Sequence, residues 1–163
     1  MESLEKYEGK AVGIQVETVG ESGHRKTAYF VGILVKDKRP GYYMLKDKLG
    51  SEGVLLKRDD IKKIATLKYG AAGVAKISGL IIHEEKCNGC GNCVIACPAN
   101  VSLSRKIAGG KGPGSDKALM QVIDGKSEGL NLDMCRRFGE PGEPLLSCTV
   151  CAEVCPTDAI EFV

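Results

Sequence analysis

The sequence contains no tryptophan, and aromatic residues make up only 5% of its 163 residues. It also lacks any apolar run near the roughly 18–20 residues that a membrane-spanning helix needs, Tyr29–Val35 being among the longest. No apolar segment of the secretory type occurs at the start, so we expect a cytoplasmic protein without a membrane span. Basic and acidic residues nearly balance, 23 against 21, which argues against a strongly basic nucleic-acid-binding tail.

Cysteine is absent from residues 1–86, and all eight cysteines lie between Cys87 and Cys155. The charge balance also differs between these two parts of the sequence. Residues 1–86 carry 16 basic and 12 acidic side chains, whereas residues 87–163 carry 7 basic and 9 acidic ones. Thiols stay reduced in the cytoplasm, so clustered cysteines indicate metal binding rather than disulfides. We predict a domain over 1–69, a small, glycine-rich linker over 70–79 and a second domain over 80–163.

The first domain is predicted to be a β-structure of the α+β class. Residues 3–8 could form a short helix with Ser3 as its N-cap. Five short strands in about 65 residues suggest a small closed barrel, because closure removes exposed sheet edges. Their order resembles SH3-like or Sm-like barrels, and we expect a docking role. The predicted strands are Val12–Val16, Ala28–Val35, Tyr42–Leu45, Val54–Leu56 and the segment from Ile61 to Ile64.

A basic run in the first domain leaves nucleic-acid binding open as an alternative to docking. The run is accompanied by only two tyrosines, Tyr42 and Tyr43, on which bases could stack. Proteins that bind single strands usually combine a stronger basic stripe with aromatic side chains. We therefore favour a solvated or docking face, formed by Lys57, Arg58, Lys62, Lys63 and Lys68.

The second domain opens with a closely spaced cysteine motif. Cys87, Cys90, Cys93 and Cys97, followed by Pro98, form the pattern C-x2-C-x2-C-x3-C-P. This spacing is typical of bacterial ferredoxins, in which three thiolates bind one iron–sulfur cluster and the fourth binds the other cluster. The x3 step favours a helical turn that carries Cys97 away from the first three thiolates, and Pro98 stops that turn.

A second copy of the motif occurs 58 residues later, where the matching residues are Cys148, Cys151, Cys155 and Pro156. Leu145 stands where the first cysteine of this copy would be. The remaining cysteine is Cys135, which predicts a loop inserted over 136–147. Two prolines and two glycines in this segment favour an irregular excursion.

If the fourth cysteine of each motif binds the cluster of the other motif, the sequence predicts two [4Fe-4S] clusters. One would be bound by Cys87, Cys90, Cys93 and Cys155, and the other by Cys97, Cys135, Cys148 and Cys151. Two alternatives remain: a free thiol at Cys135 beside a three-ligand cluster, and structural zinc, which the overlapping spacing fits poorly. No catalytic triad, carboxylate pair or nucleotide-binding loop is evident, so we expect electron transfer rather than an independent catalytic site.

The segments around the motifs predict further structure. Strands over 80–83 and 159–163 could pair and cover one side of the clusters, with His83 as a sheet residue. A hairpin is expected from 118–123 and 130–132, with a turn at Asp124-Gly125. The glycine-rich loop over 108–114 lacks phosphate-loop spacing and would more readily contact a partner.

Residues 80–163 resemble a dicluster bacterial-type ferredoxin. The first motif, with the glycine-rich loop and the stretch to Cys135, resembles the small ferredoxin-like subunit of archaeal formylmethanofuran dehydrogenase. The resemblance implies a protein that passes low-potential electrons toward a molybdenum or tungsten subunit that reduces carbon dioxide in methanogenesis, with a polyferredoxin among its partners. The alternatives are a ferredoxin subunit of a 2-oxoacid oxidoreductase or hydrogenase, or a redox-sensing nucleic-acid-binding barrel.

Overall fold

The computed structural model describes most of the chain, and its gaps coincide with several of the predicted loops. Most of the glycine-rich loop 108–114 and of the predicted insertion 136–147 lies outside the described residues, as does about half of the predicted linker 70–79. The described residues are 3–50, 53–68, 70, 74, 76–107, 109–110, 116–138 and 148–163.

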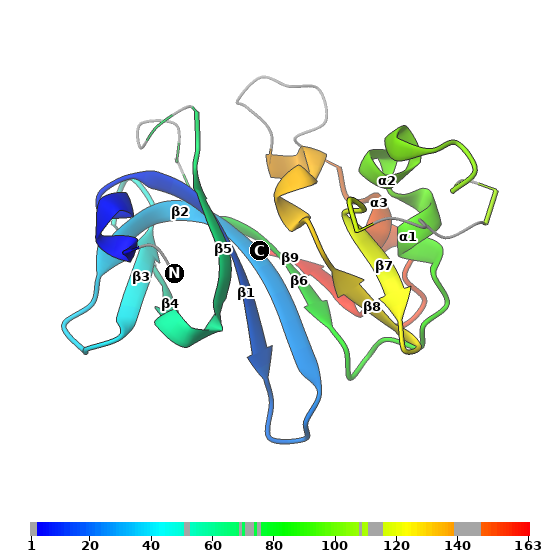
Figure 1. Ribbon diagram of the computed structural model, residues 1–163, viewed down its shortest axis with the longest axis horizontal. Helices are drawn as coiled ribbons and strands as arrows, with labels where there is room; N and C mark the ends of the chain where they lie inside the picture. The colour runs from blue at the N-terminus through cyan, green and yellow to red at the C-terminus, as the bar shows by residue number, and fades with distance from the viewer. Residues whose placement is uncertain are drawn as a thin grey trace.

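The five strands predicted for the first domain are all present and lie side by side in an antiparallel sheet (Figure 1). A short 3-10 helix, Leu4–Tyr7, precedes them, and the Ser3 hydroxyl accepts a hydrogen bond from the Glu5 N–H at 3.4 Å, as expected for an N-cap. The strands are β1 (Ala11–Val19), β2 (Arg25–Lys36), β3 (Tyr42–Lys46), β4 (Gly53–Lys57) and β5 (Ile61–Thr66).

The sheet does not close into the predicted barrel. Its order is β4-β3-β2-β1-β5, and β4 and β5 are not paired with each other among the described residues. Strand β2 is longer than its partner β3, which pairs only with the C-terminal part of β2. The N-terminal part of β2 pairs instead with β6 (Ser78–His83), which draws the sheet away from closure. The sheet therefore continues into the cysteine-containing half of the chain, and the α+β class holds without a closed barrel.

The predicted pairing of the segments that flank the cysteine motifs is confirmed. Strand β6 lies antiparallel to β9 (Ile160–Phe162), with Leu80 opposite Phe162. Gly79 and Val163 extend the ladder through a reciprocal pair of backbone hydrogen bonds. One seven-stranded sheet thus joins both halves of the chain, and the domain boundary at 69/80 remains a prediction.

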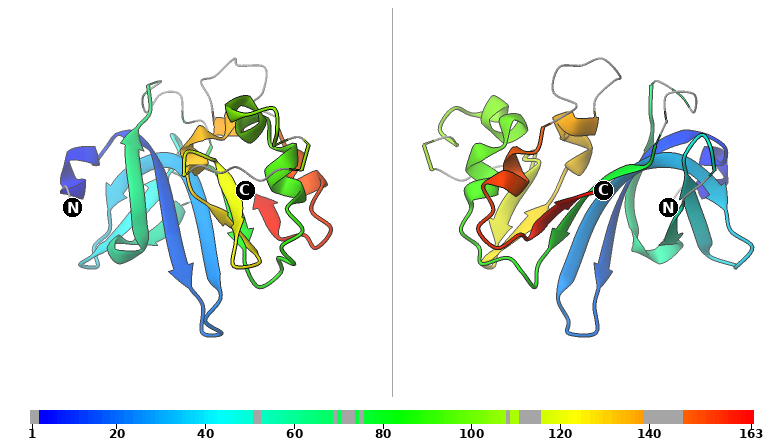
Figure 2. Two further views of the ribbon diagram at one scale, coloured as in Figure 1. Left: turned by 45° about the vertical axis from the view of Figure 1, so that its right-hand side comes forward. Right: turned by 180° about the vertical axis from the view of Figure 1, so that it is seen from behind.

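Short helices and a second, two-stranded sheet cover the β6–β9 end (Figures 1 and 2). The turn at Asp124-Gly125 is confirmed, since both residues have positive φ angles, but its second strand directly follows the turn rather than spanning 130–132. The elements are α1 (Asn92–Ala96), α2 (Pro98–Leu103), β7 (Met120–Ile123), β8 (Lys126–Gly129), 3-10 helices at Leu132–Met134 and Arg136–Phe138, and α3 (Val150–Glu153).

Strand β2 separates two hydrophobic cores. Successive side chains of a strand point to opposite faces. Ala28 and Phe30 therefore enter the core formed by strands β1–β5, while Tyr29 and Val31 enter the core that contains the cysteines. No helix in the described part of the chain is long and apolar enough to cross a membrane. The fold thus sets the cysteines directly against one face of the main sheet.

Candidate functional site

The first cysteine loop follows β6 and is shaped by two glycines. Gly89 and Gly91 have φ angles of +72° and +76°, a conformation that residues with side chains rarely adopt. A Cβ atom on Gly89 would overlap the carbonyl oxygen of Gly125, in the turn between β7 and β8. The cysteine loop can therefore lie directly against this hairpin only because residue 89 has no side chain.

A break between α1 and α2 separates the last cysteine of the first motif from the others. Helix α1 ends at Ala96, Cys97 has an extended backbone with φ −66° and ψ 119°, and α2 starts on Pro98. Proline fits the first position of a helix because the N–H it lacks would have no partner there. Pro98 thus ends one helical turn, as predicted, and also begins the next.

Each of two cavities is lined by four cysteines, and each set combines both motifs. The first cavity is small and is lined by Cys87, Cys90, Cys93 and Cys155. The second cavity is also small and is lined by Cys97, Cys135, Cys148 and Cys151. These are the two sets expected if the fourth cysteine of each motif lies with the first three of the other.

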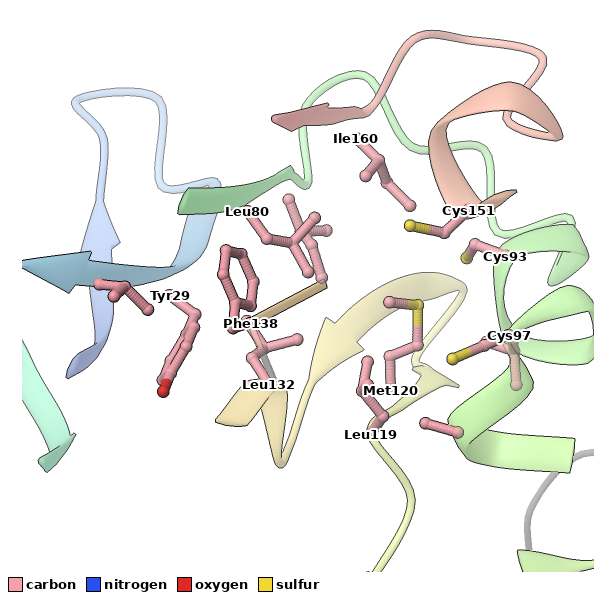
Figure 3. Packing of buried hydrophobic residues seen from close by; sticks show 14 residues of the cluster. Tyr29, Leu80, Cys93, Cys97, Leu119, Met120, Leu132, Phe138, Cys151 and Ile160 are labelled. Atoms are coloured by element: carbon pink, nitrogen blue, oxygen red, sulfur yellow. The ribbon is translucent and has the colours of Figure 1, made fainter. Parts of the chain in front are cut away.

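The cysteines surround these cavities rather than converging on a point. Among the residues that the structure describes, no three His, Cys, Asp or Glu side chains are arranged to hold a single metal ion. Figure 3 shows the thiols of Cys93, Cys97 and Cys151 directed toward apolar side chains that include Met120 and Ile160. The donor chemistry, four thiols around a small apolar-walled space, fits a polynuclear iron–sulfur group.

The walls of the two cavities differ in polarity. The second is bounded by the buried Leu80, Leu119 and Met120 and by Phe162, with Arg136 as the charged lining residue. The first contains two hydroxyl groups among its lining residues, and its sulfur atoms receive several hydrogen bonds. The Cys87 sulfur accepts from the N–H of Gly89 at 3.4 Å and of Ser127 at 3.3 Å, and the Cys155 sulfur accepts from the N–H of Ala159 at 3.3 Å.

Burial governs the acidity of most of these thiols. It raises the pKa of Cys135 to about 11 and that of Cys151 to about 12, with neighbouring cysteines adding to the effect. Burial likewise raises the pKa of Cys93 and Cys97. Metal-free, these four thiols are therefore neutral near pH 7, and metal coordination would deprotonate them.

Cys155 differs in this respect. Burial acts to raise its pKa, but backbone N–H groups that include those of Thr157 and Ala159, with the Thr157 hydroxyl, outweigh burial and lower the pKa. Such donors stabilise negative charge on sulfur. The first cavity therefore offers its sulfurs the more polar surroundings.

A buried asparagine connects the helices of the first motif to the hairpin sheet. The Asn100 side chain is fully buried; its amide donates to the carbonyl oxygens of Val94 at 3.1 Å and Met120 at 2.9 Å. Its own oxygen accepts from the Leu119 N–H at 2.8 Å. Asn100 thus fixes α1 and α2 against β7, a role that the sequence alone did not indicate.

The main sheet also holds the segment that leads to Cys135. The buried Gln15 side chain on β1 donates to the Gly129 carbonyl at 3.1 Å and accepts from the Leu132 N–H at 3.2 Å. On β5, the Lys63 ammonium group donates to the carbonyl of Leu130 at 2.7 Å. Part of the predicted basic face therefore makes contacts within the molecule, where it helps to place the 3-10 turn before Cys135.

His83 lies outside both cavities, on the sheet that flanks them. His83 lies on β6, as expected, with its ring nitrogens 3.2 Å from a Glu85 oxygen and 3.0 Å from a Glu161 oxygen. Ile160, from the predicted strand over 159–163, lines the first cavity, and Val94 is buried in the surrounding core. Sequence reasoning missed Ser127, which contacts two cysteines of the first cavity from the β7–β8 hairpin.

Comparison with known proteins identifies the same region of the chain. Residues 80–101 match the family model described as a 4Fe-4S binding domain. Pyruvate synthase subunit PorD of Thermotoga maritima is 30% identical over 102 residues, which cover 63% of this chain and 75% of that protein. The chain therefore belongs, together with PorD, to the family of 4Fe-4S ferredoxin-type proteins.

Two shorter matches within the family have higher identity. A subunit of the tungsten-containing formylmethanofuran dehydrogenase 2 of Methanopyrus kandleri is 51% identical over 47 residues, which are 28% of this chain. The polyferredoxin protein FwdG of Methanocaldococcus jannaschii is 43% identical over 54 residues, which are 33% of this chain. The chain spans 60% and 65% of the lengths of these two relatives.

Proposed function

We propose that this chain is an electron-transfer subunit that holds two [4Fe-4S] clusters and serves a formylmethanofuran dehydrogenase-like complex. The observation that carries the proposal is the presence of two cavities, each lined by four cysteines drawn from both motifs. A [4Fe-4S] cluster supplies one-electron chemistry when it is bound. Four thiolate ligands leave no iron open to substrate, so the role is conduction rather than catalysis.

Different residues of the chain would serve the two cluster sites. Cys87, Cys90, Cys93 and Cys155 would hold one cluster, and Cys97, Cys135, Cys148 and Cys151 the other. Leu80 and Phe162 exclude water from the second site, and backbone N–H groups stabilise negative charge on the sulfurs of the first. Cys90 is the exposed member of the eight cysteines, so the first site is the one whose ligand reaches the surface for exchange with a partner.

Iron and acid-labile sulfide, measured per chain after anaerobic purification, test the clusters. We expect about eight of each, with EPR of the reduced protein showing two interacting paramagnetic centres. Zinc in place of iron, or about four irons per chain, would contradict the proposal.

A second candidate, the ferredoxin subunit of a 2-oxoacid oxidoreductase, is favoured by the match to PorD, which covers more of both proteins than the other matches. Gel filtration of an anaerobic extract distinguishes the two. Co-migration with a tungsten or molybdenum enzyme and a polyferredoxin supports the first, whereas co-migration with pyruvate-oxidising activity supports the second. Co-purifying RNA would instead indicate a nucleic-acid-binding role.

A further inference from the structure

Ser127 belongs to neither cysteine motif, yet its backbone N–H and its hydroxyl both contact cysteines. It lies on β8, 40 residues after Cys87 and 34 after Cys93, and it is buried. Its backbone N–H donates to the Cys87 sulfur at 3.3 Å, and its hydroxyl oxygen lies 3.3 Å from the Cys93 sulfur. One residue of the hairpin thus contacts two of the four sulfurs around the first cavity.

The direction of the hydroxyl contact follows from the chemistry of the ligand. A cysteine that binds iron is a thiolate and has no hydrogen to give. The Ser127 hydroxyl must then be the donor to Cys93, and its hydrogen bond is charge-assisted. Reduction adds negative charge that spreads over the sulfurs, so a donor at this position stabilises the reduced form more than the oxidised form.

The residues that the structure describes around the second cavity provide no equivalent hydroxyl. Its described lining residues include no serine, threonine or tyrosine, and the walls near its cysteines are mainly apolar. A hydroxyl donor within contact of a cysteine ligand therefore distinguishes the first site, where Thr157 also lies 3.7 Å from the Cys155 sulfur.

We propose that Ser127 raises the reduction potential of the cluster bound by Cys87, Cys90, Cys93 and Cys155, through hydrogen bonds to two of its sulfurs. The inference rests on the proposed function, because it requires a cluster in the first cavity. It assigns the β7–β8 hairpin a tuning role: without touching iron, the hairpin sets how readily one of the two clusters accepts an electron.

The test compares EPR-monitored redox titrations of the full chain and of Ser127→Ala, both purified anaerobically. The substitution removes the hydroxyl and keeps the backbone N–H. We expect one midpoint to fall, equivalent to a threefold to tenfold smaller reduction equilibrium constant (59 mV for tenfold), with the other midpoint unchanged. Ser127→Thr retains a hydroxyl and should stay near the wild-type value. Ser22→Ala, in the exposed turn after β1, is the matched control and should change neither midpoint.

The outcomes separate the inference from the proposed function. If Ser127→Ala keeps about eight irons and both midpoints are unchanged, the tuning role is overturned while the clusters stand. If the wild type itself lacks one cluster, the proposed function fails first. If Ser127→Ala does not hold iron, deuterium ENDOR of the reduced wild type in D₂O supplies the second measurement. A hydroxyl deuteron coupled to one cluster supports the role, and its absence overturns it.

Discussion

Cys135 is the cysteine that departs most from regular ferredoxin spacing, because twelve residues separate it from Cys148. The structure compensates for this distance by placing it at the end of the 3-10 turn Leu132–Met134, beside the second cavity. Its thiol is partly buried and its pKa is raised to about 11, so it would be an unreactive neutral thiol without a metal. We infer that it completes the second cluster.

Replacement of Cys135 tests this inference directly. In Cys135→Ala we expect the loss of at least one iron per chain and of the spin–spin interaction between the reduced clusters, because one cluster loses a ligand. Iron analysis and EPR measure both effects. Met134→Ala, at an exposed neighbouring side chain, serves as control. Unchanged iron and EPR would make Cys135 a free thiol, the alternative that the sequence left open.

Gln15 is a second residue with a defined role, since both ends of its buried amide are paired across the interface between the halves of the chain. Gln15→Leu would leave the Gly129 carbonyl and the Leu132 N–H buried without this partner. We expect the free energy of unfolding to fall by about 1–3 kcal/mol, measured by anaerobic denaturant unfolding of the iron-loaded protein. Gln121→Leu, at a half-buried position on β7, should have a much smaller effect; equal losses would argue against a specific role for Gln15.

At the scale of elements, the first cysteine loop packs against the β7–β8 hairpin through a close contact at Gly89. Gly89→Ala would press a methyl group into the Gly125 carbonyl oxygen and strain a φ of +72°. Gly9→Ala separates these effects, because Gly9 has a similar φ of +74° and open space around it. We expect Gly9→Ala to cost about 1–2 kcal/mol in unfolding free energy, and Gly89→Ala to cost more and to release iron from one cluster. Equal costs with full iron in both variants would show that the close contact is unimportant.

The elements that could be predicted from the sequence are those with local signals. Alternation of apolar residues predicted β1, a segment apolar on both faces predicted β2, and neighbouring turn residues marked the short strands β3 and β4. Ser3 marked the first helical turn, and Asp124-Gly125 marked the hairpin turn. The second strand of the hairpin was misplaced because Lys126–Gly129 has no apolar alternation. The closed barrel was wrong for another reason: β2 continues past β3 and pairs with β6, and pairing between distant strands has no local signature.

The residues of the site likewise divide into those with a local signal in the sequence and those without one. Cysteine spacing predicted both four-cysteine sets, which the structure brings around two cavities. Ser127, Gln15 and Asn100 carried no such signal, since their partners depend on how the chain returns on itself; Gln15 and Gly129, for example, are 114 residues apart. Polar side chains of this kind are recognised only once the contacts are known.

At the scale of the whole molecule, cysteines of both motifs and the main sheet share one hydrophobic core. This core contains Tyr29 and Val31 from β2 together with three cysteines, and Tyr29 packs against Phe138 with ring centroids 5.1 Å apart. Metal binding in such small sites contributes directly to folding free energy. The β6–β9 end should therefore depend on iron more than strands β1–β5, which have a separate core.

Removal of iron tests this dependence. We expect chelation to abolish amide hydrogen-exchange protection in α1, α2 and α3 and in the β7–β8 hairpin, while β1 and the second half of β2 remain protected. Hydrogen exchange followed by mass spectrometry, with iron-loaded protein as the reference, measures each segment. A well-dispersed NMR spectrum of the iron-free protein, with protection unchanged throughout, would contradict the expectation.

The claim on which the account depends is that each cluster takes three cysteines from one part of the chain and its fourth from the other. Iron anomalous diffraction from anaerobically grown crystals tests it most directly. The account predicts two peaks of iron density, one bound by Cys87, Cys90, Cys93 and Cys155 and the other by Cys97, Cys135, Cys148 and Cys151. A single peak, a zinc edge in place of iron, or two clusters each bound within one motif would contradict it.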